Sequence, residues 1–93
     1  MFKKTFGEET IQAVWEKGQE VSSWDSTKFR KDKCGAPITH SQYGNIDSDE
    51  GWEIDHINPD GSDHISNLRP LQWANNRAKS DNRDGGWTCA IRG

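Results

Sequence analysis

The segment that most constrains the fold is WEIDHI, residues 52–57, in which apolar side chains flank an adjacent acid and imidazole, Asp55 and His56. Tryptophan and isoleucine favour a strand, and neighbouring residues of a strand point to opposite faces. One of the two polar side chains must therefore face inward, where an unpaired charge is costly. A salt bridge or an edge strand would explain the pair structurally, and a metal or catalytic site would explain it functionally.

The hydrophobic core has to be small, because only 30% of the 93 residues are hydrophobic. Five tryptophans compensate in part, since each aromatic ring buries a large area. The low mean hydropathy favours a further staple such as a metal or a dimer partner. No apolar run reaches transmembrane length, and no signal-peptide core is evident. We expect a soluble, cytoplasmic protein without a membrane partner that is a monomer or a homodimer.

The two cysteines, Cys34 and Cys89, are too few for a disulfide framework or a thiolate zinc site. We expect two reduced thiols that pack as small hydrophobes. A zinc site completed by His40 and His64 is the alternative, although no C-x-x-C spacing supports it.

Charge is distributed unevenly around a net value of −3. Residues 34–66 contain seven acids and no lysine or arginine, whereas residues 67–93 contain five basic and two acidic groups. An acidic middle beside a basic end suits a cation site next to a phosphate site, and a solvated acidic loop is the alternative.

Apolar periodicity predicts a helix near the N-terminus. Ile11, Val14 and Trp15 are spaced i, i+3 and i+4, which places them on one face of a helix over residues 7–18. Thr5 has the spacing of a capping-box residue at its start. We expect this helix to pack on the core without a chemical role.

The remaining patterns predict a single α+β domain over residues 1–93. Its expected parts are a helical segment (1–33), then a hairpin and mixed core (36–81) with strands over 36–43, 52–57 and 67–71, a helix over 73–80, and an irregular tail from 81. Within the first part, the polar segment 22–35 carries Lys28, Arg30 and Lys31. These three side chains either contact DNA phosphates or form a solvated surface, and both interpretations stay open.

Three further polar residues follow WEIDHI and are candidates for the same site. Asn67 follows His56 by eleven residues, and Asn76 lies nine residues further on. Lys79 is three residues beyond Asn76, on the same face of the predicted helix. The arrangement can place the carboxylate of Asp55 and an amide oxygen around one cation, with an imidazole beside it.

The run DHINPDGSDHISNLRPLQWANNRAKSD resembles the HNH nuclease motif, in its variant with asparagine at the third position. Its ending, NNRAKSD, is similar to the HNH domain of RNA-guided CRISPR effectors. The weaker similarity upstream, through RKDKCGAPI and SQYGN, is to small stand-alone bacterial and phage HNH proteins. The resemblance over residues 52–81 implies a ββα-metal finger, here with an N-terminal helix and a short β-hairpin. The loop carries one glycine, Gly61, where relatives often have two.

The resemblance also implies a role for each motif residue. Asp55 and Asn76 would be the metal ligands, and His56 the general base. Asn67 would brace the loop, and Lys79 would lie near the scissile phosphate. Because both ligands are hard oxygen donors, Mg²⁺ or Mn²⁺ is the expected cation, with Zn²⁺, Ni²⁺ or Co²⁺ as alternatives.

The implied activity is a weakly specific DNA endonuclease that nicks or cuts both strands and leaves 5′-phosphate and 3′-hydroxyl ends. Arg69 and Arg77 are candidates for phosphate contacts, because guanidinium groups match phosphate oxygens. Surface ion pairs with Asp60 or Asp63 are the alternative for both. Two other functions stay open: a noncatalytic DNA-binding or structural metal module, and a nuclease toxin, which would need a delivery segment or an immunity partner.

Overall fold

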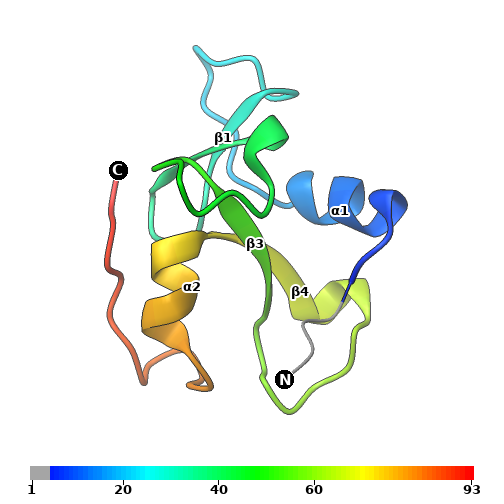
Figure 1. Cartoon of the computed structure of the whole chain (residues 1–93), viewed down its shortest axis with the longest axis vertical. Coiled ribbons are helices and arrows are strands. Elements are labelled where there is room, and N and C mark those ends of the chain that lie inside the picture. Colours follow the sequence, from blue (N-terminus) through cyan, green and yellow to red (C-terminus); the bar gives the residue numbers. More distant parts are fainter. Residues whose placement is uncertain (1–4) are drawn as a thin grey trace.

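The computed structural model of the protein describes residues 5–93 as an α+β fold with two α-helices and two small antiparallel sheets (Figure 1). In chain order, the elements are α1 (Glu8–Trp15), β1 (Phe29–Lys31), β2 (Pro37–Thr39), the 3-10 helix η1 (His40–Gln42), β3 (Trp52–His56), the 3-10 helix η2 (Ile65–Asn67), β4 (Leu68–Gln72) and α2 (Trp73–Lys79). The predicted α+β class is confirmed for this part of the chain. None of its helices has the length and apolar character needed to cross a membrane.

The first sheet pairs β1 with β2, and β1 is a strand that the sequence patterns missed. It lies in the polar segment 22–35, where Phe29 is the one large apolar residue of the strand. The strand predicted over 36–43 is shorter than expected, because the chain turns into η1 after three paired residues. An isolated bridge between Tyr43 and Trp52 links this region to β3.

The second sheet pairs β3 with β4, and α2 follows β4 directly. The register sets Asp55 opposite Arg69 and His56 opposite Leu68. Gln72 ends β4 and caps α2, because its side-chain oxygen accepts hydrogen bonds from the first turn of the helix. α2 packs against both strands. The bounds of these three elements lie within one residue of the predicted ones.

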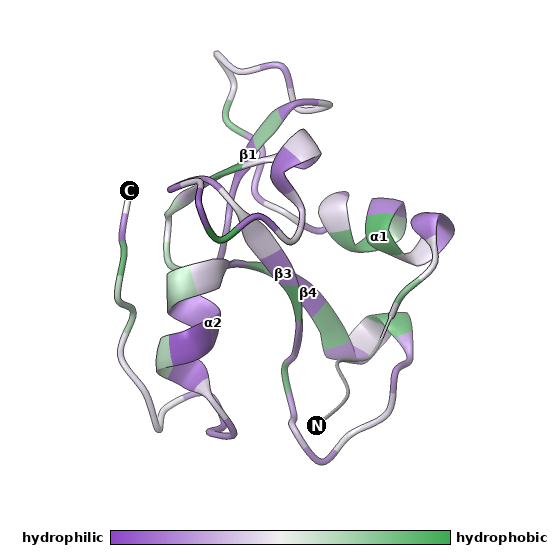
Figure 2. Ribbon diagram, viewed as in Figure 1, coloured by the Kyte–Doolittle hydropathy of each residue, from purple (hydrophilic) through white to green (hydrophobic). Residues whose placement is uncertain are grey.

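The core lies where α1 meets the two sheets. Val14 and Trp15 of α1 are fully buried with Ile38, Trp52 and Leu68. Figure 2 shows hydrophobic residues in α1 and β4, whereas α2 is largely hydrophilic. The buried residues of α2, Asn75 and Lys79, are both polar, and the site described below lies beside this helix.

α1 is shorter than predicted at both ends. Its N-cap is Gly7 in an extended conformation, with no side-chain capping hydrogen bond, so Thr5 does not cap the helix. The first turn instead carries Glu8 and Glu9, whose negative charges suit the positive end of the helix dipole.

The two cysteines form a disulfide bond, which corrects the prediction of reduced thiols. The tail from residue 81 is irregular and runs back alongside α2 (Figure 1). Asn75 holds it there, since its side chain exchanges hydrogen bonds of 2.8 and 2.9 Å with the backbone of Ile91. The return of the tail brings the Cα atoms of Cys34 and Cys89 to 6.0 Å despite a separation of 55 residues. Spacing in the sequence contains no sign of this proximity.

Reduction of the Cys34–Cys89 bond should destabilise the protein. A cross-link that closes a loop of this length removes unfolded-state entropy equivalent to about 4 kcal/mol. We expect urea unfolding in dithiothreitol, or of the double variant Cys34→Ser/Cys89→Ser, to show a free energy of unfolding lower by about this amount. Identical unfolding curves for oxidised and reduced protein would contradict the tethered tail.

A buried carboxylate, Asp32, ties the turn after β1 to α2. Its Oδ1 accepts hydrogen bonds from the backbone nitrogens of Cys34 and Ala36, both at 2.9 Å. Its Oδ2 accepts from the backbone nitrogen of Gln72 and from the side chain of Asn75, at 2.9 and 3.0 Å. The charge is therefore satisfied by four donors, and Asp32 is a structural residue.

Candidate functional site

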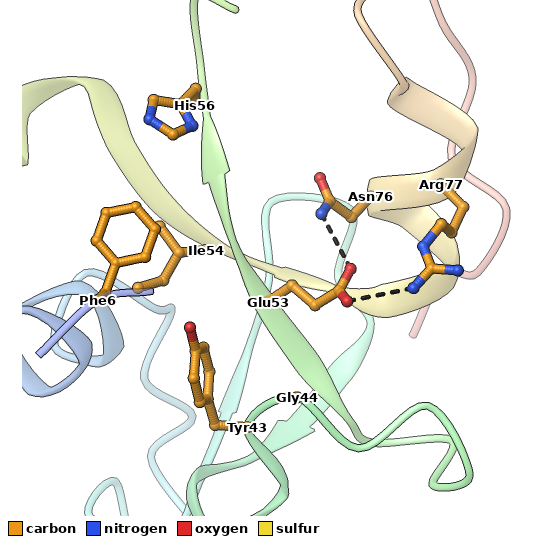
Figure 3. Close-up of a pocket in the computed structure, with 8 residues that line it drawn as sticks. All are labelled: Phe6, Tyr43, Gly44, Glu53, Ile54, His56, Asn76 and Arg77. Atoms are coloured by element: carbon orange, nitrogen blue, oxygen red, sulfur yellow. Dashed lines mark hydrogen bonds and ion pairs between the residues drawn. The ribbon is translucent and has the colours of Figure 1, made fainter. Parts of the chain in front are cut away.

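The alternation of β3 separates its polar side chains between two faces. Figure 3 shows Glu53 pointing toward α2. His56 lies on the opposite side of the strand, the side on which Ile54 points toward Phe6. Asp55 shares the face of Glu53, because the two are two residues apart on one strand. The acid and the imidazole of WEIDHI therefore do face opposite ways, as the sequence predicted.

Asp55 is 4% exposed and lies between two cations. Its Oδ2 accepts a hydrogen bond from Arg69 Nε at 2.8 Å, and its Oδ1 lies 3.1 Å from Lys79 Nζ. Lys79 is itself 1% exposed and also donates to the carbonyl oxygen of His56 at 2.8 Å. The ammonium of Lys79 is thus directed at Asp55 and the end of β3.

The residues expected to carry the chemistry gather around one cavity. Asp55, His56, Asn76 and Lys79 line a hollow of about 220 Å³ between the end of β3 and α2. A larger cavity, of about 450 Å³, adjoins it, because Ile54, His56 and Asn76 line both. Residues that are 24 positions apart in the sequence, Asp55 and Lys79, are therefore neighbours at this site.

Glu53 is a residue of this site that the sequence reasoning missed. Its Oε1 accepts a hydrogen bond from Asn76 Nδ2 at 3.0 Å, and its Oε2 lies 3.3 Å from a nitrogen of Arg77 (Figure 3). The amide oxygen of Asn76 consequently points away from Glu53. Alternation along β3, two residues before Asp55, is the signal that could have identified it. Burial and the nearby Glu53 carboxylate raise the pKa of Tyr43, which lines the larger cavity.

Asp63 is the second residue that the sequence reasoning did not place at the site. Its Oδ1 lies 2.6 Å from His56 Nε2. An imidazole that donates its Nε2 hydrogen to a carboxylate keeps its lone pair on Nδ1. Asp63 therefore fixes both the orientation and the tautomer of His56.

Asn67 braces the loop that carries Asp63. Its Oδ1 accepts from the backbone nitrogen of Asn58 at 2.9 Å, and its Nδ2 donates to the carbonyls of Asn58 and Ser62 at 3.1 and 2.9 Å. A Cβ at Gly61 would lie 2.6 Å from that same Nδ2. The single glycine of the loop is therefore where the Asn67 side chain passes closest.

Arg69 connects the site to the C-terminal tail. Its two terminal nitrogens each donate to a carboxylate oxygen of Asp84 at 2.8 Å. Burial opposes the charge on Arg69, but the hydrogen bonds and charges of Asp84 and Asp55 outweigh it and raise its pKa. The hydrogen bonds from Arg69 in turn hold the pKa of Asp84 well below its usual range. Neither Asp60 nor Asp63, the ion-pair partners considered from the sequence, forms this contact.

The three basic residues proposed from segment 22–35 differ in their exposure. Arg30 is 9% exposed, and its guanidinium donates to the backbone carbonyls of Ser26, Glu16 and Gly18, so its role is structural. Lys28 is exposed, whereas Lys31 is half-buried. Two of the three remain available to an anion.

The donors around Asp55 suit a hard cation that is held partly by water. A carboxylate has about four lone-pair sites, of which Arg69 and Lys79 use two. The amide oxygen of Asn76 adds a second oxygen donor. Residues 5–93 contain no group of three or more His, Cys, Asp or Glu that could hold a metal. Two protein oxygens, completed by waters and a substrate phosphate, match the coordination of Mg²⁺.

The two other histidines are hydrogen-bonded elsewhere. His40 Nε2 bonds with Gln12 Oε1 at 2.8 Å. His64 Nδ1 bonds with the hydroxyl of Ser66 at 2.9 Å and caps η2. Because the disulfide occupies both cysteine sulfurs, the alternative four-ligand zinc site does not form.

Comparison with known proteins finds no matching family, no similar curated protein and no similar solved structure. Evidence for function therefore lies in the residues of the site. These place an oriented imidazole, a carboxylate and an amide oxygen around one solvent-accessible hollow.

Proposed function

We propose that the chain is a metal-dependent endonuclease of the HNH type that hydrolyses phosphodiester bonds in DNA. The observation that supports this most is that four of the five motif residues, Asp55, His56, Asn76 and Lys79, line one cavity. The fifth, Asn67, braces the adjoining loop. In this proposal, β3, β4 and α2 correspond to the ββα-metal finger.

Asp55 and Asn76 hold the cation, for which Mg²⁺ or Mn²⁺ fits the oxygen donors best. The bound cation supplies positive charge that stabilises the departing 3′ oxygen and the charge developing on phosphorus. Lys79 and Arg69 fix the carboxylate of Asp55. Glu53 accepts a hydrogen bond from the Asn76 amide nitrogen, which would leave the amide oxygen free to bind the cation.

His56 is the general base. Its Nδ1 takes a proton from a water molecule as the water oxygen forms a bond to phosphorus. The bond from phosphorus to the 3′ oxygen breaks, and the departing oxygen takes a proton from solvent water, which leaves a 5′-phosphate and a 3′-hydroxyl. Asp63 orients the imidazole, and Asn67 keeps the loop of Asp63 in place.

Arg77 is the best-placed contact for DNA phosphate near the cavity. Its side chain is 50% exposed and lines the larger cavity. Its guanidinium lies 6.0 Å from the centre of the Trp73 ring, which limits its mobility. The pair with Glu53 is partly solvated and easily exchanged for a phosphate.

One active site faces one strand, so supercoiled plasmid should be nicked before it is linearised. We expect open-circular product first and linear DNA later in a time course with Mg²⁺, and no product in EDTA. Gel analysis at several protein concentrations provides the measurement. Linear product from the start, with a rate that rises as the square of protein concentration, would instead indicate a dimer that cuts both strands.

A noncatalytic DNA-binding module is the second candidate. The contacts of Asp55 with both Arg69 and Lys79 favour it, because two cations already balance the carboxylate. DNA binding without any EDTA-sensitive nicking would support this function over the first.

A further inference from the structure

A second basic site lies on the other side of Arg69. A cavity of about 110 Å³ is lined by four basic side chains, Lys17, Lys31, Lys33 and Arg69. Asp32 is the one acid in its lining, and its carboxylate already accepts four hydrogen bonds from other protein groups. It is therefore engaged elsewhere and does not pair with the four basic side chains. These four side chains are called the basic pocket.

The basic pocket gathers cations from separate parts of the fold. Lys17 follows α1, Lys31 ends β1, Lys33 lies in the turn to β2, and Arg69 lies on β4. Burial and the charge of Arg69 lower the pKa of Lys17. Bringing like charges together is unfavourable unless an anion balances them.

The anion that Arg69 already holds comes from the tail. The two oxygens of Asp84 accept a hydrogen bond from each terminal nitrogen of Arg69, and one of them lies 3.6 Å from Lys33 Nζ. Trp87 donates to Asp84 at 3.1 Å, and its ring centre lies 5.6 Å from Lys33. A paired carboxylate on a guanidinium has the geometry with which arginine also binds phosphate.

We propose that the basic pocket binds a backbone phosphate of duplex DNA and that Asp84 competes with this phosphate for Arg69. The inference rests on the proposed nuclease function and extends it with a second contact to the substrate. Because Arg69 Nε donates to Asp55 at 2.8 Å, this phosphate lies beside the catalytic cavity. Lys33 joins the candidate contacts, and Lys28, which lines a different cavity, does not. Lys17 adds positive charge to the pocket, but its ammonium donates to the backbone carbonyls of Ile65 and Leu68.

The test compares matched lysines. Affinity for a short duplex is measured by fluorescence anisotropy across a salt series, with His56→Ala as the parent so that the DNA stays intact. Each phosphate contact contributes about 0.9 to the slope of log affinity against log salt. We expect Lys33→Gln and Lys31→Gln each to reduce the slope by about this amount. Lys28→Gln loses the same charge and should leave the slope unchanged.

Removal of the tail carboxylate should change DNA affinity in the opposite direction to removal of a lysine. Asp84→Asn should bind DNA several-fold more tightly than the parent. The matched control is Asp60→Asn, because the exposed pair of Asp60 with Arg83 is outside the pocket. Circular dichroism of each variant verifies folding.

The outcomes separate this inference from the proposed function. Equal slope changes for Lys28→Gln and Lys33→Gln, or unchanged slopes for all the lysine variants, would overturn the basic pocket, even if the wild type cleaves DNA in Mg²⁺. Equal effects of Asp84→Asn and Asp60→Asn would overturn the competition. If the wild type neither cleaves nor binds duplex DNA at low salt, the nuclease proposal fails and the pocket proposal with it.

Discussion

Replacement of Asp55 by alanine is expected to reduce DNA cleavage to the level seen in EDTA. The substitution removes the one carboxylate of the proposed metal pair and leaves Lys79 without its carboxylate partner, whereas Arg69 keeps its pair with Asp84. The unbalanced ammonium of Lys79 at the cavity would repel a divalent ion as well. Initial rates of plasmid nicking across an Mg²⁺ series provide the measurement.

A second variant separates this effect from loss of folding. Asp55→Asn keeps the volume of the side chain but removes its charge, and it too should be inactive while circular dichroism matches that of the wild type. Asp60→Asn loses an equal charge on the exposed loop and should cleave normally. Cleavage by Asp55→Asn at the wild-type rate would contradict the role of Asp55 as a ligand.

Replacement of His56 by alanine is expected to slow single-turnover cleavage by about 10²–10⁴-fold. DNA affinity and the dependence on Mg²⁺ concentration should be retained, because His56 acts on the water and not on the cation. The matched control is His64→Ala, which removes an imidazole that is bonded to Ser66.

Two further readouts test the assignment of His56. Asp63→Asn should lower the rate by less than His56→Ala, since it weakens the orientation of the base without removing it. Loss of Mg²⁺ dependence in His56→Ala would identify His56 as a ligand instead. An unchanged rate would exclude it as the base.

Local patterns predicted the elements that position the site. β3, β4 and α2 are each specified by their own residues: alternation in WEIDHI, turn formers before Asn67, and a polar helical run after Gln72. The opposite orientations of Asp55 and His56 follow from strand geometry alone. These features depend only on residues that are close in the sequence, so local sequence patterns can predict them.

The contacts that the sequence did not reveal are between distant residues. The Cys34–Cys89 bond requires the tail to run beside α2. Arg30 reads as a surface cation but is buried, because the backbone carbonyls of the α1 end and the following loop surround its guanidinium. The basic pocket likewise depends on how α1, β1 and β4 pack. The sequence around Lys17 and Lys33 therefore gives no indication that the two residues lie in one pocket.

The roles of Glu53 and Lys79 show the limit of the motif itself. A motif identifies which residues act but not which atoms they contact. Lys79 bonds with Asp55, and Glu53 bonds with Asn76, so both are positioning residues for the proposed ligands. The resemblance implies that Lys79 lies near the scissile phosphate, and this stays a prediction; in the structure its buried ammonium bonds with Asp55.

The most direct test of metal-dependent hydrolysis at this centre is whether DNA ligase can reseal the nicks that the protein makes. Supercoiled plasmid is incubated with purified wild type or with Asp55→Asn, prepared in parallel, in Mg²⁺ or in EDTA, and the open-circular product is then treated with DNA ligase. We predict that the wild type nicks in Mg²⁺ only, that Asp55→Asn does not nick, and that ligase alone reseals the nicks because they carry 5′-phosphate and 3′-hydroxyl ends. Nicking that persists in EDTA or in Asp55→Asn, or nicks that ligase cannot seal, would contradict the account.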